Sequence, residues 1–220
     1  MRRVWTLLAI LAITAVVSGC SDFAGYQYQQ YGQLLNLAWN PPSDKISLGQ
    51  AEDVPYASIG VEVGDQEQRL LVLASSLSQQ RFWMFKSHMV IVTQHGRIVS
   101  TGGLRKNLTG LAIQGTVDPK SALLDPGKVE HFLADFADLN AYSVPIACRP
   151  KPAVPVRIKI LGHPIKTLRV DEDCRAPLLK WDFTDRFWLD PYSHMTWQSE
   201  QYIHPNFPAV RIQVLRPVAE

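Results

Sequence analysis

The amino-acid sequence predicts a mainly β protein: a single domain built on one curved antiparallel sheet, shaped as a half-barrel or a sandwich. From residue 56 onward, short apolar or alternating segments recur between tight turns, which is typical of an antiparallel meander. Helical periodicity is confined to two stretches, so we expect one or two short helices packed against the sheet. We divide the chain into a signal peptide (1–19), a tether with a short helix (20–45) and one β domain (46–220).

The N-terminal residues have the pattern of a lipoprotein signal peptide. Two arginines precede an apolar run, 4–17, that is too short to span a bilayer, which takes about 20 residues. Small residues at positions 18 and 19 give a peptidase access to the backbone before Cys20. We expect the Cys20 sulfur to accept diacylglycerol, and its palmitate-like chains, at about 0.8 kcal/mol per buried methylene, to hold the mature protein on a membrane. The alternative is an ordinary signal peptide with an incidental cysteine.

Sorting and charge limit the partners of the mature chain. Ser21 stands where an aspartate would favour retention in the inner membrane, so we expect the lipid anchor at the periplasmic face of the outer membrane. Removing residues 1–19 removes two arginines and no acids, which lowers the formal net charge from +2 to 0. The basic residues are spread singly, whereas nucleic-acid binding needs a clustered Lys/Arg face. We therefore expect the membrane, and no nucleic acid, among the partners.

An aromatic-rich stretch follows the lipidated cysteine. Tyr28, Tyr31 and Leu35 lie near helical spacing, and prolines at positions 41 and 42 stop the pattern. We predict that 22–39 consists of a tether of several residues followed by an amphipathic helix that packs against the domain. The alternative is a helix lying on the membrane, but this stretch has almost no Lys or Arg to hold anionic lipid.

The first half of the β domain reads as strands joined by tight turns. Gln94-His95-Gly96-Arg97 predicts a hairpin turn in which glycine supplies a positive φ. Residues 101–104 predict a bend after a strand. The expected strands cover 56–63, 69–74, 82–93 and 97–100.

Between residues 125 and 140 the spacing of the apolar residues changes from the alternation of a strand to the period of a helix. Prolines at positions 126 and 145 suit the boundaries of a helix there. An apolar stripe at i, i+3, i+4, i+7 and i+10 predicts that helix: Val129, Phe132, Leu133, Phe136 and Leu139.

Cys148 and Cys174 either form a disulfide, which an oxidising periplasm favours, or stay reduced and buried. Alternation on both sides of residues 162–164 predicts a hairpin whose paired residue numbers sum to 326, with Val156 opposite Val170. In that register Cys148 faces position 178, so the proline-containing stretch 150–155 must bulge for the sulfurs to meet. Closing a loop of about 26 residues would contribute roughly 3 kcal/mol.

Three further strands are expected over 178–189, 196–203 and 209–215.

Motifs for catalysis or cofactor binding are missing from the sequence. The six histidines include no pair at i, i+4, and there is no glycine-rich phosphate loop and no Gly-x-Ser-x-Gly. We therefore expect no metal, no cofactor and no enzymatic activity. Acidic residues at 171–173 and at Asp182, Asp185 and Asp190 lie in turn-like sequence and are interpreted as solvated. A glycan hydrolase using Asp182 or Asp190 stays open, because paired carboxylates hydrolyse glycosides when about 5 to 10 Å apart.

Two segments, 81–104 and 181–201, combine tryptophan with arginine, aspartate and glutamine. Such side chains stack on sugar rings and bond hydroxyl groups, and they equally pack the core of a sheet. Core packing is the alternative for each tryptophan. The candidate glycan or partner contacts are Trp83, Arg97, Trp188, Asp190, Trp197 and Gln201.

At these segments the chain resembles the YjbF-type (GfcB-type) group 4 capsule polysaccharide lipoproteins. The resemblance rests on the cysteine motif ending at Cys20, the turn 96–104, the segments 187–190 and 197–201, and the closing stretch 205–217. It covers most of the mature chain and supplies no catalytic motif. Residues 191–194 replace a glycine-containing turn of the relatives, so we expect a longer or differently shaped turn there.

The resemblance implies a mainly antiparallel β lipoprotein that serves capsule or exopolysaccharide secretion. We expect a non-enzymatic accessory factor, acting by binding extracellular polysaccharide or by docking a polysaccharide-export protein. The alternatives are the hydrolase described above and a purely structural envelope protein. Replacing Cys20 with Ala separates the importance of anchoring from that of a binding site.

Overall fold

The computed structural model describes residues 45–85, 89–114, 119, 123 and 125–218. Cys20 and the predicted tether and helix over 22–39 lie outside these residues. The chain from Asp44 to Glu220 forms one compact unit. Within the described ranges no helix is both long and apolar enough to cross a membrane.

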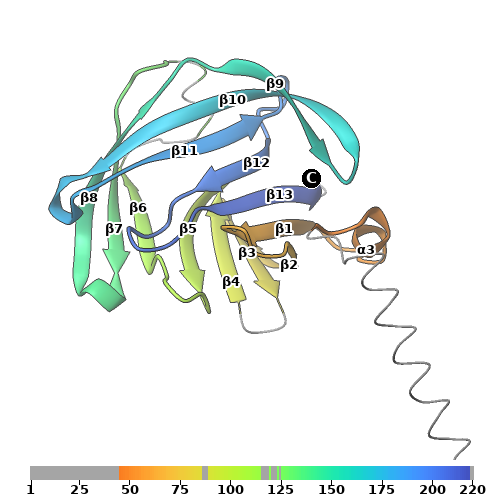
Figure 1. The fold of residues 1–220 in the computed structure, drawn as a ribbon, viewed down its shortest axis with the longest axis horizontal. Helices are drawn as coiled ribbons and strands as arrows, with labels where there is room; N and C mark the ends of the chain where they lie inside the picture. Colours follow the sequence, from red (N-terminus) through yellow and green to blue (C-terminus); the bar gives the residue numbers. More distant parts are fainter. Residues whose placement is uncertain (1–44, 86–88, 115–118, 120–122, 124, 219–220) are drawn as a thin grey trace, which may run out of the picture. The chain divides into compact units, whose positions relative to one another are not determined.

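The domain is one antiparallel sheet that curls until it is nearly closed into a barrel (Figure 1). The prediction of a mainly β, antiparallel protein is confirmed. The segment expected over 82–93 is divided between two strands, and the one expected over 178–189 begins as a turn of 3₁₀ helix. The strands are β1 (Ser58–Val63), β2 (Arg69–Leu77), β3 (Gln80–Phe85), β4 (Met89–Gln94), β5 (Arg97–Gly102), β6 (Gly110–Gln114), β7 (Glu130–Phe136), β8 (Ala141–Pro150), β9 (Val154–Ile160), β10 (His163–Ala176), β11 (Trp181–Leu189), β12 (Thr196–Gln201) and β13 (Val210–Arg216).

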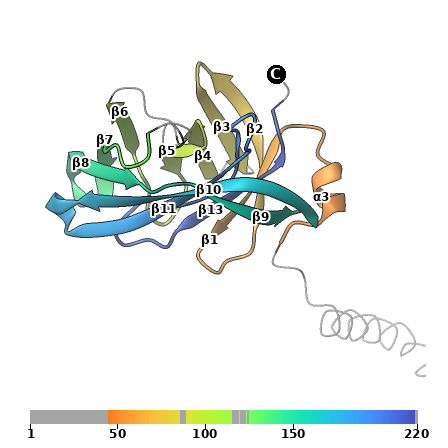
Figure 2. The same cartoon turned by 90° about the horizontal axis from the view of Figure 1, so that it is seen from above.

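The strand order brings the two ends of the sheet together. The order is β5-β4-β3-β2-β1-β13-β12-β11-β10-β8-β7-β6, while β9 pairs with β10 beside this path (Figure 2). Just before β6, the Leu108 carbonyl accepts from the Thr101 amide at 2.8 Å and the Thr109 carbonyl accepts from the Ser100 hydroxyl at 3.0 Å. These bonds join the chain before β6 to β5, so the sheet is closed further than a half-barrel.

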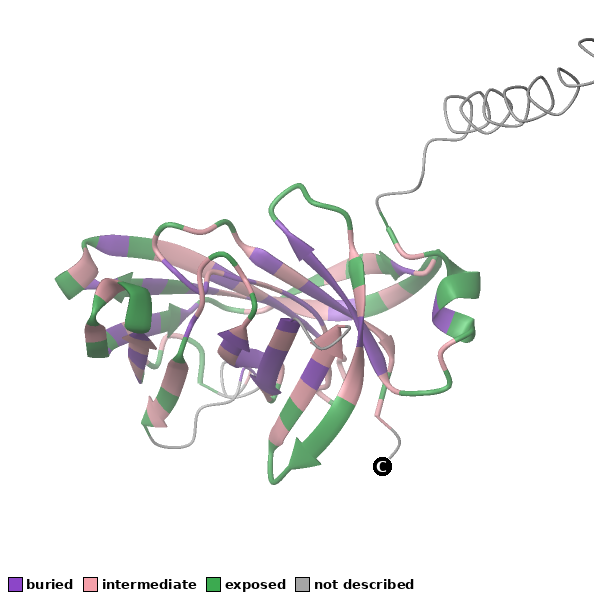
Figure 3. Ribbon diagram, turned by 90° about the horizontal axis from the view of Figure 1, so that it is seen from below, coloured by how far each residue is buried: buried purple, intermediate pink, exposed green. Residues whose placement is uncertain are grey.

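Buried and exposed residues alternate along several of the strands (Figure 3), as expected where one face of a sheet packs on the core. On β7, Phe132, Ala134 and Phe136 are buried, whereas His131 is exposed. The predicted helix over 125–140 is therefore wrong. Phe132 and Phe136, four residues apart, fit both periods, and pairing with β6 and β8 decides for the strand.

The helices and 3₁₀ turns that the structure delimits between residues 45 and 218 are short. The α-helix α3 (Leu48–Glu52) begins at Ser47, whose hydroxyl accepts from the Gln50 amide while the Gln50 side chain accepts from the Ser47 amide, a capping box. Two 3₁₀ turns, η1 (Ala137–Leu139) and η2 (Pro177–Leu179), each end at a residue with positive φ, Asn140 and Lys180.

The hairpin between the cysteines forms in a different register from the predicted one. Val156 pairs with Thr167 and not with Val170, so the paired numbers sum to 323 and not 326. The turn consists of Leu161 and Gly162, both with positive φ, in a two-residue connection of the kind that matches strand twist. The prediction placed the turn at residues 162–164, and this error shifted the predicted pairing by three in the sum of paired numbers.

The disulfide between Cys148 and Cys174 is confirmed. The two cysteines lie directly opposite each other, because β8 pairs with β10 beyond the end of β9. Their numbers sum to 322, against 323 in the β9 pairing. Residues 151–153 absorb this shift of one, where the Lys151 amide donates to the Asp171 carbonyl. The register changes at the proline-containing stretch, as expected. The change is one residue, whereas the predicted hairpin register required four.

Candidate functional site

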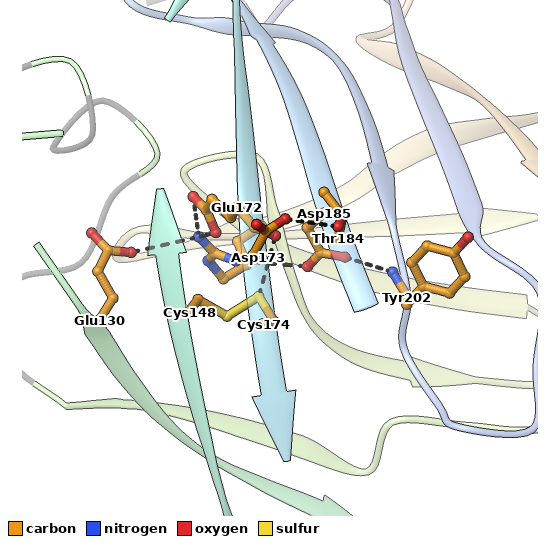
Figure 4. The surroundings of a disulfide bond; sticks show 9 residues. Glu130, Cys148, Glu172, Asp173, Cys174, Thr184, Asp185 and Tyr202 are labelled. Carbon is orange, nitrogen blue, oxygen red and sulfur yellow. Dashed lines mark hydrogen bonds and ion pairs between the residues drawn. A yellow bond between two sulfur atoms is a disulfide. The ribbon is translucent and has the colours of Figure 1, made fainter. Parts of the chain in front are cut away.

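A charged cluster occupies the interior of the sheet beside the disulfide. Arg97 of β5 donates from Nη2 to both oxygens of Glu172 of β10, at 2.9 and 2.7 Å. Glu130 of β7 lies 3.8 Å and Asp185 of β11 3.9 Å from the guanidinium. The three acids are labelled in Figure 4. All four side chains are at most 7 % exposed.

Burial and mutual attraction set the protonation of the cluster. Burial disfavours the charged form of Arg97, but attraction to Glu172, Asp185 and Glu130 outweighs burial and raises its pKa further. Burial raises the pKa of Asp185 to about 7, against the opposing effects of Arg97 and of the Tyr202 amide. Its carboxylate oxygen accepts from that amide at 2.8 Å. The guanidinium also lies over the rings of Phe132 and Phe187, 4.7 and 4.9 Å from their centroids.

Asp185 gives the protein a pH-dependent stability. In the unfolded chain its carboxyl ionises near pH 3.8, whereas in the folded protein its pKa is about 7. The protonated form therefore stabilises the fold fully below about pH 4, and this contribution is lost as the pH rises towards 7. We expect urea unfolding at pH 4.5 and 7.5 to differ less in Asp185→Asn than in the wild type, by roughly 2–4 kcal/mol. Equal differences in both proteins would contradict this assignment.

Four other acids titrate in a lower range. Bonds to neighbouring donors lower the pKa values of Asp138, Asp173, Asp190 and Glu200. Their contributions to stability are lost only as the pH falls through these depressed values. These four acids therefore contribute to the pH dependence in the opposite sense to Asp185.

Gln201 joins β12 to the edge strand β5. Its Oε1 accepts from the Ile98 amide at 2.8 Å, and its Nε2 donates to the Gly96 carbonyl at 2.9 Å. Arg97 and Gln201 thus both tie β5 to the opposite wall of the sheet. Each is at most 3 % exposed, so the structure places these two candidate contacts inside the fold.

One group of potential metal ligands lies in the described part of the chain, formed by Cys148, Glu172 and Cys174. The two sulfurs are bonded to each other, so neither offers the thiolate that metal ions bind. The Glu172 carboxylate is already held by Arg97. These residues do not fit a metal centre.

A cavity of about 440 Å³ opens at one end of the sheet. We call it the tryptophan cavity because Trp83 of β3 and Trp197 of β12 both line it. Its volume falls within the range of about 300–1,000 Å³ that is usual for small-ligand sites. Its lining combines apolar residues of the sheet with polar residues of three turns: Ile59, Ser76, Ser78, Gln79, Arg81, Trp83, Thr93, His95, Gly96, Ser193–Ser199, Ile212, Val214, Pro217 and Val218.

Asp190 holds the loop that carries one wall of the cavity. Its Oδ1 accepts from the amides of Tyr192 and Ser193, each at 2.9 Å. Its Oδ2 accepts from Nε1 of Trp197 at 3.2 Å. Asp190 is thus a positioning residue that fixes both the loop and the indole ring. Ser193 and His194, in the turn 191–194, form part of this wall.

Gly96 lets the loop before β12 pack on the turn between β4 and β5. A Cβ atom at Gly96 would lie 2.4 Å from Oγ1 of Thr196, and the φ of Gly96 is +85°. The Thr196 hydroxyl donates to the His95 carbonyl at 3.4 Å. A side chain at position 96 would separate two walls of the cavity.

We expect Gly96→Ala to lower the free energy of unfolding by about 1–3 kcal/mol, because alanine disfavours this φ and meets Thr196. Gly102→Ala, at the far end of β5, is the matched control, since its Cβ would meet nothing within 4 Å and its φ is ordinary. We expect the control to change stability by about 0.5 kcal/mol or less. Urea denaturation of both variants measures the difference, and equal losses would refute the close contact.

Two of the six candidate contacts, Trp83 and Trp197, line the cavity. A third, Asp190, does not line it but bonds the indole of Trp197. Trp83 is 4 % exposed, and its Nε1 donates to the Thr93 hydroxyl at 2.9 Å. Trp197 is half-buried. Trp188 is buried in β11 and does not belong to the lining. Arg81, His95 and His194 lie within the two segments singled out in the sequence. They were not among the candidate contacts, because turns far apart in the chain bring them together.

Asp182 and Asp190 do not form a glycosidase pair with each other. Asp182 and Asp190 stand at opposite ends of β11, eight positions and roughly 26 Å apart, well beyond the separation that such chemistry needs. Asp182 is exposed and paired with Arg175 at 2.8 Å. The expectation of solvated acids is wrong for Glu172 and Asp185, which lie in the core.

Comparisons with known proteins show the family to which this chain belongs. Residues 32–215 match the family of group 4 capsule polysaccharide lipoproteins gfcB and YjbF. The uncharacterized lipoprotein YjbF of Escherichia coli (strain K12) is 21 % identical over 217 residues, covering 94 % of this chain and 96 % of its own. The crystal structure of the hypothetical lipoprotein YmcC from Escherichia coli (K12) has the same fold: the TM-score is 0.70 at 20 % identity, over 84 % of this chain and 94 % of that one.

The chain therefore belongs to the group 4 capsule polysaccharide lipoprotein family, and the resemblance inferred from its sequence is confirmed. The names of these relatives describe lipoproteins and name no enzymatic activity.

Proposed function

We propose that this protein is an accessory factor in the assembly or export of a capsule or exopolysaccharide, acting without catalysis by holding the glycan in the tryptophan cavity. The observation that carries the proposal is the cavity itself, in which an indole ring lies among hydroxyl, amide and imidazole groups. This combination suits sugars, whose C–H faces stack on aromatic rings while their hydroxyls form hydrogen bonds. Membership of a capsule polysaccharide lipoprotein family supports the assignment.

The proposal places the domain at the periplasmic face of the outer membrane, held by a diacylated Cys20 after removal of residues 1–19. A polysaccharide leaving the cell passes this surface, where the partners would be the glycan and the export proteins. A non-catalytic role agrees with the separation of Asp182 from Asp190 and with the burial of Glu172 and Asp185.

Secretion in cells tests the proposed function. In a strain that lacks the gene, we expect the wild-type chain to restore cell-surface polysaccharide and Trp197→Ala to fail. The matched control is Tyr142→Ala, because Tyr142 is an aromatic residue, 61 % exposed, that does not line the cavity. Immunoblots establish that the three proteins reach equal levels. Normal secretion with Trp197→Ala would overturn the role of the cavity.

Anchoring is tested separately with Cys20→Ala. We expect this variant to reduce secretion while leaving glycan binding by the purified protein unchanged. Full secretion from an unlipidated form would show that the membrane anchor is not part of the function.

A further inference from the structure

The tryptophan cavity has a one-sided charge. The residues that line it include Arg81, His95 and His194 but no aspartate and no glutamate. This holds although the whole chain has nearly as many acids as Lys and Arg together, 20 against 22. Building on the proposed function, we propose that the cavity selects acidic sugars, with Arg81 binding the sugar carboxylate.

Arg81 is placed and available for this role. Arg81 lies on β3 and is exposed, and its guanidinium forms no hydrogen bond or ion pair with any residue that the structure describes. Other arginines of the sheet are engaged: Arg186 and Arg211 both pair with Glu200. A guanidinium presents two parallel N–H groups that fit the two oxygens of a carboxylate.

The two histidines come from turns that are locked together. Nε2 of His95 lies 3.0 Å from Oε1 of Gln79, which orients its ring beside the turn between β2 and β3. Thr196 packs on Gly96 and bonds the His95 carbonyl, so the loop carrying His194 is fixed against the His95 turn. The His194 imidazole lines the same cavity as Arg81 and can form a hydrogen bond with a sugar bound there.

Asp190 holds the loop of one wall but does not line the cavity. Hydrogen bonds from the Tyr192 and Ser193 amides and from Trp197 satisfy both of its oxygens. Burial raises the pKa of Asp190, but these donors outweigh burial and lower it, so the carboxylate is ionised and its oxygens face the loop and Trp197. The cavity is left with an arginine, two imidazoles and a fixed indole ring.

The test compares two ligands that differ only in charge. One is a six-unit oligomer of galacturonic acid, and the other is the same oligomer after reduction of its carboxyl groups to hydroxymethyl groups. Each is titrated by calorimetry into the full chain in detergent, in the wild type and in Arg81→Gln. Arg157→Gln is the matched control, since Arg157 is an exposed strand arginine outside the cavity. Trp197→Ala locates the binding in the cavity.

We expect the acidic oligomer to bind the wild type and Arg157→Gln at least about tenfold more tightly than its reduced form at low salt. This preference should shrink as salt screens the charges and disappear in Arg81→Gln. A preference that persists in Arg81→Gln, or no binding of the acidic oligomer, overturns the inference. Equal, Trp197-dependent binding of both oligomers overturns the charge preference alone and leaves the proposed function standing.

Discussion

Replacing Arg97 with methionine should lower the free energy of unfolding by about 3–5 kcal/mol, the usual loss when one partner of a buried ion pair is removed. Methionine keeps much of the length of the side chain but removes the positive charge beside three buried carboxyl groups: Glu130, Glu172 and Asp185. The variant also loses the contact of the guanidinium with two phenylalanine rings. Urea unfolding at pH 7.5 measures the loss.

The double variant Arg97→Met/Glu172→Gln is the control, since it removes the charge that Arg97 binds at 2.7 Å. We expect it to be more stable than Arg97→Met alone, because an unpaired buried charge costs more than a neutral amide. A loss below about 1 kcal/mol in Arg97→Met, or no recovery in the double variant, would show that the cluster does not hold the sheet together.

Removing the disulfide should have the second largest effect. The bond between Cys148 and Cys174 closes a loop with a sequence separation of 26 residues, for which chain entropy predicts about 3 kcal/mol. We therefore expect the double variant Cys148→Ala/Cys174→Ala to unfold at lower urea concentration by that amount. Reduction of the wild type should give a similar loss.

The same double variant supplies its own control, because dithiothreitol should not change its stability. If the reductant destabilised it as much as the wild type, the loss would not come from this bond. Unchanged stability of the double variant would mean that pairing of β8 with β10 needs no covalent link.

Several elements of the fold were predictable from local sequence. Alternation of Val210, Ile212 and Val214 marked β13, and His95-Gly96 marked the turn between β4 and β5. β7 was not predictable in the same way, because Phe132 and Phe136 satisfy the helical and the strand period equally. Its partners β6 and β8, which decide the outcome, are set by the closure of the whole sheet.

The candidate site was predictable only in part. Its tryptophans stood out by composition, but exposure depends on the neighbours of each strand: Trp188 is buried, while Trp197 borders a cavity. Arg97 had the chemistry of a ligand contact and serves as the cation of a buried cluster. Its partners Glu172 and Asp185 lie at least 75 positions away in the sequence, so no local pattern connects them.

The most direct test of the central claim, that the tryptophan cavity holds glycan, is a titration of the full chain in detergent. The titrant is polysaccharide purified from the cells that make the protein, and the readouts are tryptophan fluorescence and heat. We expect saturable binding that is weakened at least about tenfold by Trp197→Ala, as for an aromatic anchor, and is unchanged by Tyr142→Ala. An absence of binding at millimolar sugar, or binding equally strong in a folded Trp197→Ala variant, would contradict the claim.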